Sequence, residues 1–240
     1  MAAICVGLSV YFKLYPVALG LVLAVVYVKE FAWRFLLALI GIGAASFLLQ
    51  HPDYVWNQYQ LWFVSRVADN RRLYALQIAP RDLYMVLRAL HIPISDRVYL
   101  IIQVASGGAI ALLSWLGRYR FRWSETRLLM AIFCFVCVWM MLCGPATESA
   151  TYVIVAPAVI LALFQSFAQG VPGWMRIMIV SSLGILLMGL VINSFLRLEK
   201  NVYVMSVQPM ATLIFGCFVV AWTLRDSAWT GGDRGVRDQK

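Results

Sequence analysis

The sequence contains few charged residues. Of its 240 residues only 13% are charged, whereas 62% are hydrophobic and the mean hydropathy is +0.80. A soluble domain has about 25% charged and about 45–50% apolar residues. The composition therefore excludes an ordinary soluble domain and indicates a chain that lies mostly in lipid. The aromatic content of 14% agrees with this, because Trp and Tyr favour the membrane interface.

Residues that commonly form catalytic or metal sites are also scarce. The chain has two histidines, His51 and His91, and neither lies in an apolar run, which disfavours an intramembrane serine protease. Cys134-Phe-Val-Cys137 has the spacing of two metal ligands, but no second pair and no nearby histidine accompanies it. The hydrolase elbow, the zinc-protease motif and the phosphate-binding glycine loop are missing. We therefore predict no metal and no cofactor.

Apolar runs of about 18–22 residues predict membrane-spanning helices. Six such runs cover residues 31–49, 98–116, 128–144, 151–168, 177–196 and 207–224. The predicted fold is an all-α polytopic membrane protein with a single transmembrane domain over residues 1–224. Residues 225–240 are polar and rich in glycine, which predicts a disordered tail.

Residues 2–28 divide into two shorter apolar pieces. Residues 2–12 and 17–28 flank Lys13-Leu14-Tyr15-Pro16. Proline lacks a backbone donor and disfavours helix at the residue before it, so a break is expected here. We predict a re-entrant hairpin with Lys13 at its tip; the alternative is a single broken span.

The basic residues predict the orientation of the spans. A net charge of +9 in a soluble protein would suggest nucleic acid as a partner, but here Lys and Arg lie in short connections and the tail. One alternate set of connections holds Lys29, Arg34, Arg118, Arg120, Arg122, Arg127, Arg176, Arg225, Arg234, Arg237 and Lys240. The short connections of the other set hold only Arg197 and Lys200. We therefore expect the basic set and the tail in the cytoplasm, facing anionic lipid of the cell membrane, and no nucleic acid partner. The 50–96 loop and the Gly144–Thr151 turn are expected outside.

The 50–96 loop predicts two interfacial helices. Large apolar residues recur at helical spacing between Asp53 and Val67, which indicates an amphipathic helix lying in the membrane interface. A second helix is expected to begin at Pro80, to use Leu83, Leu87 and Leu90 as its apolar face, and to stop before Pro93. Ser95 is expected to cap the next span. Two interpretations remain open: the helices seal the outer face, or they form a lid over a lipid-exposed cleft.

Two ionisable residues in apolar surroundings are candidates for binding. Lys13 would cost roughly 2.5–3.5 kcal/mol within a membrane and so needs a partner, which could be a phosphate with Tyr15 beside it. Alternatively, the Lys13 side chain only extends to a lipid headgroup. Glu148 lies in the Gly144–Tyr152 turn among hydroxyl residues. It could bind a sugar hydroxyl, pair with Lys13, act as a base, or only cap a helix.

Several short segments resemble the second half of glycosyltransferase family 87, a family of polytopic enzymes of the GT-C type. They are Phe12-Lys13-Leu14-Tyr15-Pro16, Lys29–Arg34, Leu48–Tyr54 with Tyr59 and Trp62, and Gly144-Pro-Ala-Thr-Glu-Ser-Ala-Thr-Tyr152. The resemblance covers most of residues 8–170. It implies transfer of a hexose, of the mannosyl type, from a polyprenyl-phosphate sugar to a lipid or glycan acceptor at the outer face.

The resemblance also implies roles for particular residues. Lys13, with Arg71 or Arg72, would hold the donor phosphate, and Glu148, Tyr152 and His51 would hydrogen-bond the sugar or the acceptor. The family's usual catalytic Asp, in the first outer loop, has no counterpart in this chain. We therefore expect a truncated reading frame, one half of a split enzyme, or a relative without activity.

Two other classes of function remain open. A transporter or flippase would also use broken helices and isolated charges, although the sequence has no inverted repeat. A noncatalytic membrane subunit would dock on a partner chain through its N-terminal edge. Coupled transport should depend on an ion gradient, whereas a membrane subunit should co-purify with its partner chain.

Overall fold

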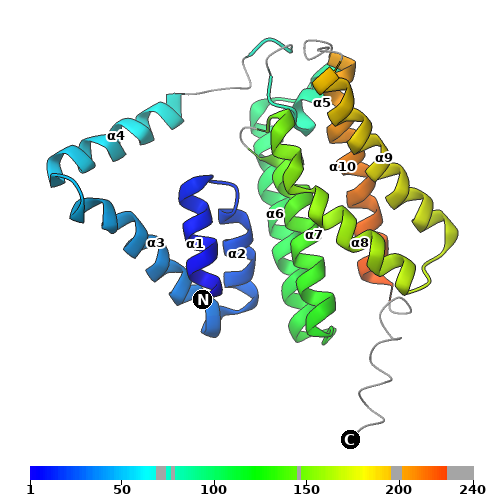
Figure 1. The fold of residues 1–240 in the computed structure, drawn as a ribbon, viewed down its shortest axis with the longest axis horizontal. Coiled ribbons are helices and arrows are strands. Elements are labelled where there is room, and N and C mark those ends of the chain that lie inside the picture. Colours follow the sequence, from blue (N-terminus) through cyan, green and yellow to red (C-terminus); the bar gives the residue numbers. More distant parts are fainter. Residues whose placement is uncertain (69–73, 77–78, 145–146, 196–201, 226–240) are drawn as a thin grey trace, which may run out of the picture. The chain divides into compact units, whose positions relative to one another are not determined.

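The computed structural model describes residues 1–68, 74–76, 79–144, 147–195 and 202–225, and these residues form helices with no strand among them (Figure 1). Six helical segments are long and apolar enough to cross a membrane. They are Val28–Leu48, Asp96–Tyr119, Glu125–Cys143, Ser149–Ala168, Gly173–Ile192 and Val204–Leu224. They overlap the six predicted spans, so the prediction of an all-α polytopic membrane protein is confirmed.

The chain divides into two compact units. Unit 1 comprises Met1–Tyr74 and unit 2 comprises Ala75–Lys240. That residues 1–224 form a single transmembrane domain stays a prediction. Except for Arg225, the predicted disordered tail of residues 225–240 lies outside the described residues.

Unit 1 begins with a helical hairpin. Helix α1 (Ala2–Phe12) and helix α2 (Val17–Val26) are separated at Lys13, whose backbone is extended, and by the turn that contains Pro16. The two helices lie side by side and run in opposite directions (Figure 1). The two helices are separated at Lys13–Pro16 as expected, so a helical hairpin is present, and its re-entrant position in the membrane stays a prediction.

The rest of unit 1 consists of one long helical segment and a second helix. A π-helical turn (Val28–Ala32), helix α3 (Trp33–Ala45) and a 3-10 turn (Ser46–Leu48) form the segment, and helix α4 (Pro52–Ala68) follows. Helix α1 packs closely against α3, since a Cβ atom on Gly7 would lie 3.1 Å from the Cβ of Ala38.

Helix α4 exposes apolar side chains around most of its circumference. The predicted face contains Val55, which is buried, and Tyr59, Trp62 and Phe63, which are exposed. Tyr54 and Val64, on the other side of the helix, are exposed as well. The helix is present as predicted, but its apolar surface extends beyond the one face that the spacing indicated.

Unit 2 is a bundle around one central helix. Its elements are helix α5 (Leu83–Ala89), helix α6 (Asp96–Tyr119), helix α7 (Glu125–Cys143), the 3-10 turn η5 (Ser149–Ile154), helix α8 (Ala156–Ala168), helix α9 (Gly173–Phe195) and helix α10 (Val202–Leu224). Helix α7 packs against α6, α8 and α10 and is buried along most of its length. Cys134 and Cys137 lie on it as buried packing residues.

Capping residues set the starts of three helices in unit 2. Ser95 accepts a hydrogen bond from the Val98 amide at 3.3 Å, and Ser124 accepts one from the Arg127 amide at 3.4 Å. Before helix α5, the side chain of Asp82 accepts a hydrogen bond from the Met85 amide at 2.9 Å. Such side chains satisfy amides that have no partner within the helix. The predicted cap at Ser95 is therefore confirmed.

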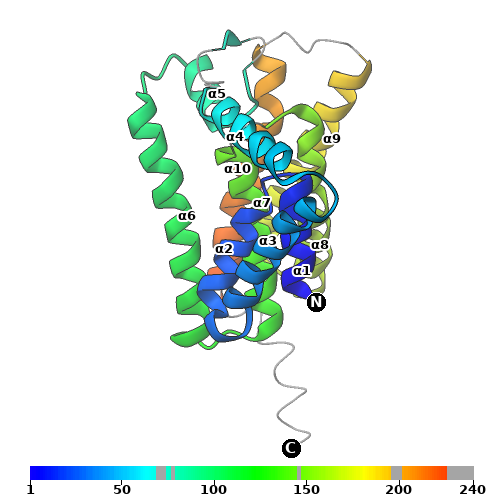
Figure 2. The ribbon, with the colours of Figure 1, turned by 90° about the vertical axis from the view of Figure 1, so that its left-hand side faces the viewer.

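Helix α5 buries a different side from the one that its leucines predict. Met85 and Val86 are buried and pack with Met205 of helix α10, whereas Leu90 of the predicted face is 62% exposed. The bundle covers the methionine side because α5 lies against α7 and the start of α10 (Figure 2). The Leu83, Leu87 and Leu90 stripe is consequently not the packing face.

Candidate functional site

Buried polar residues gather at the end of unit 2 where helix α7 ends and helix α10 begins. They come from three separate segments: the residues before α5, the η5 turn with Thr147 before it, and the first half of α10. We call this group the polar cluster; it comprises the buried Arg81, Asp82, Thr147, Tyr152 and Gln208 together with the half-buried Ser149. Buried polar groups are stable only when they are hydrogen-bonded, so their convergence in an apolar bundle indicates a specific role.

Arg81 is held in the cluster by its backbone and its side chain. Its amide donates a 2.7 Å hydrogen bond to the Thr147 carbonyl, and its own carbonyl accepts one from the Tyr152 hydroxyl at 2.6 Å. Its Nη1 donates to Oε1 of Gln208 at 3.3 Å. The side chain is only 7% exposed, as is that of Asp82, so a cation and an anion lie in one buried segment.

Gln208 connects helix α10 to the η5 turn. Its Oε1 also accepts a hydrogen bond from Ser149 Oγ at 3.0 Å, and its Nε2 donates to the Ser149 carbonyl at 3.4 Å. The next residue, Pro209, lies inside α10 and cannot donate to the carbonyl of Met205. The Gln-Pro pair therefore places a fully buried amide next to the point in α10 where one backbone hydrogen bond is missing.

The turn after helix α7 is anchored by side chains of helix α6. Tyr99 donates to the Leu142 carbonyl at 2.9 Å, and Gln103 donates to the Cys143 carbonyl at 2.6 Å. These carbonyls belong to the last turn of α7, where no partner within the helix is left for them. These two hydrogen bonds thus fix the end of α7, from which the chain continues to Thr147 and η5.

Thr147 is the member of the cluster whose hydroxyl lacks a partner. Its side chain is fully buried, and its Oγ1 makes no hydrogen bond to any residue that the structure describes. A buried hydroxyl without a partner costs about 1–3 kcal/mol. Such a group at a polar site is well suited to hydrogen-bond a ligand.

Two predicted site residues, Glu148 and Tyr152, lie in this region. Tyr152 is 1% exposed and is committed to the Arg81 carbonyl, so it positions the cluster. Glu148 is exposed and precedes η5, where its amide contacts Thr151 Oγ1 at 3.4 Å and its carbonyl accepts from the Thr151 amide at 2.9 Å. Its backbone thus serves the helix-start role that was one of the alternatives, and its carboxylate is accessible beside the cluster.

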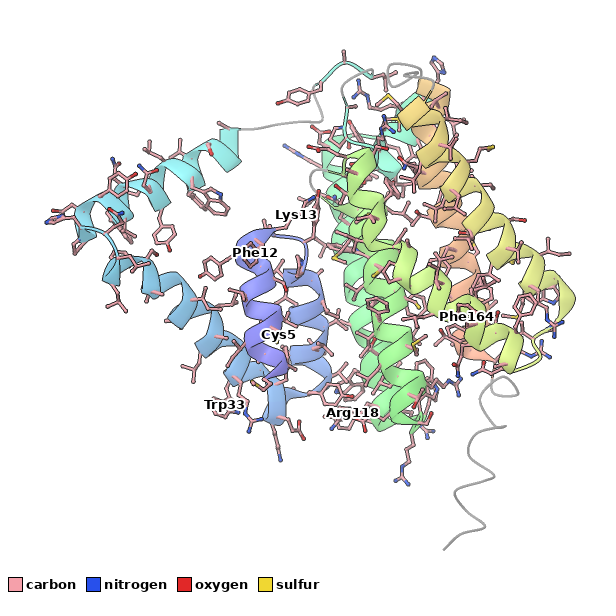
Figure 3. All side chains as sticks on the ribbon, viewed as in Figure 1. Cys5, Phe12, Lys13, Trp33, Arg118 and Phe164 are labelled. Carbon is pink, nitrogen blue, oxygen red and sulfur yellow. The ribbon has the colours of Figure 1, made fainter. Side chains whose placement is uncertain are left out.

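The remaining predicted residues belong to unit 1 or lie outside the described part of the chain. Lys13 is exposed at the turn between α1 and α2 (Figure 3), with its Nζ 5.3 Å from the ring centroid of the buried Tyr15. This is a cation–π contact, so the expected proximity of the two residues is confirmed. Because Lys13 and Glu148 belong to different units, their pairing stays a prediction.

His51 lies at the exposed start of helix α4. Its Nδ1 is 3.5 Å from Oδ2 of Asp53, and the two side chains are 75% and 94% exposed. Arg71 and Arg72 lie outside the described residues. Binding roles for these three residues stay predictions.

No family model, curated protein or solved structure matches this chain. The site is therefore interpreted from its own chemistry. Among the residues that the structure describes, no group of three or more His, Cys, Asp or Glu side chains could hold a metal ion.

Arg81, Thr147 and Gln208 are not distinguished by the sequence pattern alone. Gln208 was included in an apolar span, although a polar side chain followed by proline within a span is itself a signal for a functional site. Only the fold brings these three residues together.

The polar cluster combines groups that suit a phosphorylated, hydroxyl-rich ligand. A guanidinium binds phosphate through paired N–H donors, and amide and hydroxyl groups bind sugar hydroxyls. The surrounding helices carry exposed apolar side chains that suit a lipid chain, such as Ile101 and Val104 of α6.

Proposed function

We propose that this multi-pass membrane protein binds a polyprenyl-phosphate-linked sugar at the polar cluster and takes part in hexosyl transfer of the GT-C type. The observation that carries the proposal is the burial of Arg81 with Thr147 and Gln208 at one end of the spans. The Gly144–Tyr152 segment, which resembles family 87, supplies Thr147, Ser149 and Tyr152 to this cluster.

The proposed roles follow from the chemistry of transfer. The C1–O bond between sugar and phosphate breaks, the acceptor oxygen forms a new bond to C1 and gives up its proton to the departing phosphate, and polyprenyl phosphate leaves. Arg81 would stabilise the negative charge that develops on the phosphate. Thr147 and Gln208 would orient the sugar hydroxyls, and Glu148 would bind a hydroxyl of the sugar or the acceptor. Lys13, in unit 1, stays a separate candidate for binding a phosphate, with Tyr15 beside it.

Binding of the donor by the full chain tests this proposal. The chain in lipid nanodiscs should bind polyprenyl-phosphate mannose in preference to polyprenyl phosphate, as measured by native mass spectrometry. Arg81→Gln should weaken donor binding at least tenfold, since hydrogen bonds to a charged group contribute about 1.5–3 kcal/mol. Arg88→Gln is the matched control, because it removes the same charge from α5, where Arg88 lies 5.9 Å from the ring centroid of Tyr84.

Two results would overturn the proposal. One is equal donor binding by Arg81→Gln and the unsubstituted chain. The other is ion-gradient-dependent uptake of a solute by proteoliposomes without any transfer of hexose to an acceptor, which would favour a transporter.

A further inference from the structure

Arginine residues gather at the opposite end of unit 2. The α6–α7 turn, the α8–α9 turn and the last residues of α10 meet at this end (Figure 1). We call this region the arginine end; it contains Arg118, Arg120, Arg122, Arg127, Arg176 and Arg225. Glu125 is the one acidic residue among the described residues 118–127, 168–176 and 222–225. The region therefore has a strongly positive charge.

Two of these arginines contact the bundle itself. Arg127 is buried, donates from Nε to the Thr223 carbonyl at 3.1 Å and also from Nη2 to the same oxygen, and lies 4.5 Å from the ring centroid of Trp123. Arg176 lies 5.2 Å from the ring centroid of Phe167. Both residues therefore have roles within the protein.

Arg122 has a backbone conformation that normally requires glycine. Its φ angle is +49°, in the left-handed region, where a side chain crowds the backbone. The turn is fixed by hydrogen bonds from the Phe121 amide to the Leu116 carbonyl and from the Trp123 amide to the Gly117 carbonyl, both of 2.8 Å. An exposed arginine at a position that suits glycine points to a function for its side chain.

The surroundings of Arg122 suit the surface of a membrane. Arg120 is exposed as well, and the aromatic side chains of Tyr119 and Phe121 beside it are 49% and 54% exposed. Figure 3 shows Arg118 at this end of helices α6 and α7. Aromatic rings favour the headgroup level, and arginines near it attract anionic lipid.

We propose that the α6–α7 turn binds the headgroup of an anionic phospholipid. Arg120 and Arg122 contact its phosphate, while Tyr119 and Phe121 contact the glycerol and the first acyl carbons. This site lies at the end of unit 2 opposite the polar cluster, and it does not depend on the proposed function.

The experiment compares lipid binding by two double variants. Full-length chain in neutral detergent is titrated with dioleoylphosphatidylglycerol and, separately, with dioleoylphosphatidylcholine, and bound lipid is counted by native mass spectrometry. Arg120→Gln with Arg122→Gln should weaken phosphatidylglycerol binding about 25-fold at low salt, or about fivefold for each arginine. Arg88→Gln with Arg97→Gln is the matched control, since it removes the same charge from the other end of unit 2.

A third variant separates lipid binding from the stability of the turn. Arg122→Gly should raise the melting temperature, because glycine adopts the left-handed conformation without strain, and should still weaken phosphatidylglycerol binding about fivefold. Unchanged phosphatidylglycerol binding by Arg122→Gly would overturn the proposal. Equal losses in the two double variants, or equal binding of the two lipids by the unsubstituted chain, would overturn it as well.

Discussion

The hydroxyl of Tyr152 donates a 2.6 Å hydrogen bond to the backbone carbonyl of Arg81, which lies 71 positions earlier in the chain. This bond fixes the segment before helix α5 against the η5 turn, and both residues are buried. It therefore helps to determine where the arginine is held.

Replacement of Tyr152 by phenylalanine tests this link. The variant leaves the buried Arg81 carbonyl without its hydroxyl donor, which should lower the free energy of unfolding by about 1–3 kcal/mol. Unfolding in mixed micelles monitored by circular dichroism provides the measurement. Tyr54→Phe is the control, because Tyr54 is 56% exposed and loss of its hydroxyl should change the free energy of unfolding by less than about 0.5 kcal/mol. Equal stability of the two variants would show that the bond contributes nothing.

Replacement of Thr147 by valine should have the opposite effect on stability. The hydroxyl is buried and unpartnered among the described residues, so its removal should be neutral or should stabilise the protein by up to about 1 kcal/mol. Donor binding should nevertheless weaken if Thr147 contacts the sugar. Thr223→Val is the control, since its hydroxyl is also buried and unpartnered in the described structure but lies at the arginine end. Calorimetry of both variants, with and without the sugar donor, separates the effect on stability from the effect on donor binding.

Gly117 is expected to tolerate no side chain. A Cβ atom there would lie 2.5 Å from Cε3 of Trp123, so Gly117→Ala should displace the ring and destabilise the protein by about 1–3 kcal/mol. Gly108→Ala, in the same helix, meets no atom within 4 Å and should be neutral or stabilising, because alanine favours helix over glycine by up to about 1 kcal/mol. Melting temperatures of the two variants give the comparison. A destabilised Gly108→Ala would contradict the packing described for α6.

Arg127 is expected to resist even conservative replacement. Lysine cannot donate twice to the Thr223 carbonyl and stack on Trp123, so Arg127→Lys should lower the free energy of unfolding by about 1–3 kcal/mol. Arg120→Lys, at an exposed position of the same turn, should leave stability within about 0.5 kcal/mol of the unsubstituted chain. Denaturant titration of both variants decides whether the buried contacts, rather than the charge alone, matter.

The spans and the hairpin could be predicted because each depends on local sequence. The length of an apolar run decides whether a helix can cross the membrane, and Pro16 interrupts the first helix whatever surrounds it. The packing side of α5 could not be predicted in the same way. The stripe of Leu83, Leu87 and Leu90 is equally suited to protein and to lipid, so its apolar character does not indicate which of them it contacts.

The polar cluster could be predicted only in part. Tyr152 and the turn around Glu148 were found because a polar segment between two spans is conspicuous in the sequence. Arg81 and Gln208 are separated by 127 positions, and only the packing of α5 and α10 against α7 brings them within hydrogen-bonding distance.

The burial of helix α7 has a consequence for synthesis of the protein. Its mean hydropathy is 2.2, yet 72% of its span is covered by other parts of the chain, including α8 and α10, which are translated later. The nascent helix must therefore remain in lipid on every side until its neighbours arrive, which accounts for apolar residues around its whole circumference. The thiols of Cys134 and Cys137 lie beside the Ala158 and Ile154 carbonyls in the completed fold, so in the unfinished chain the same two side chains are exposed to lipid.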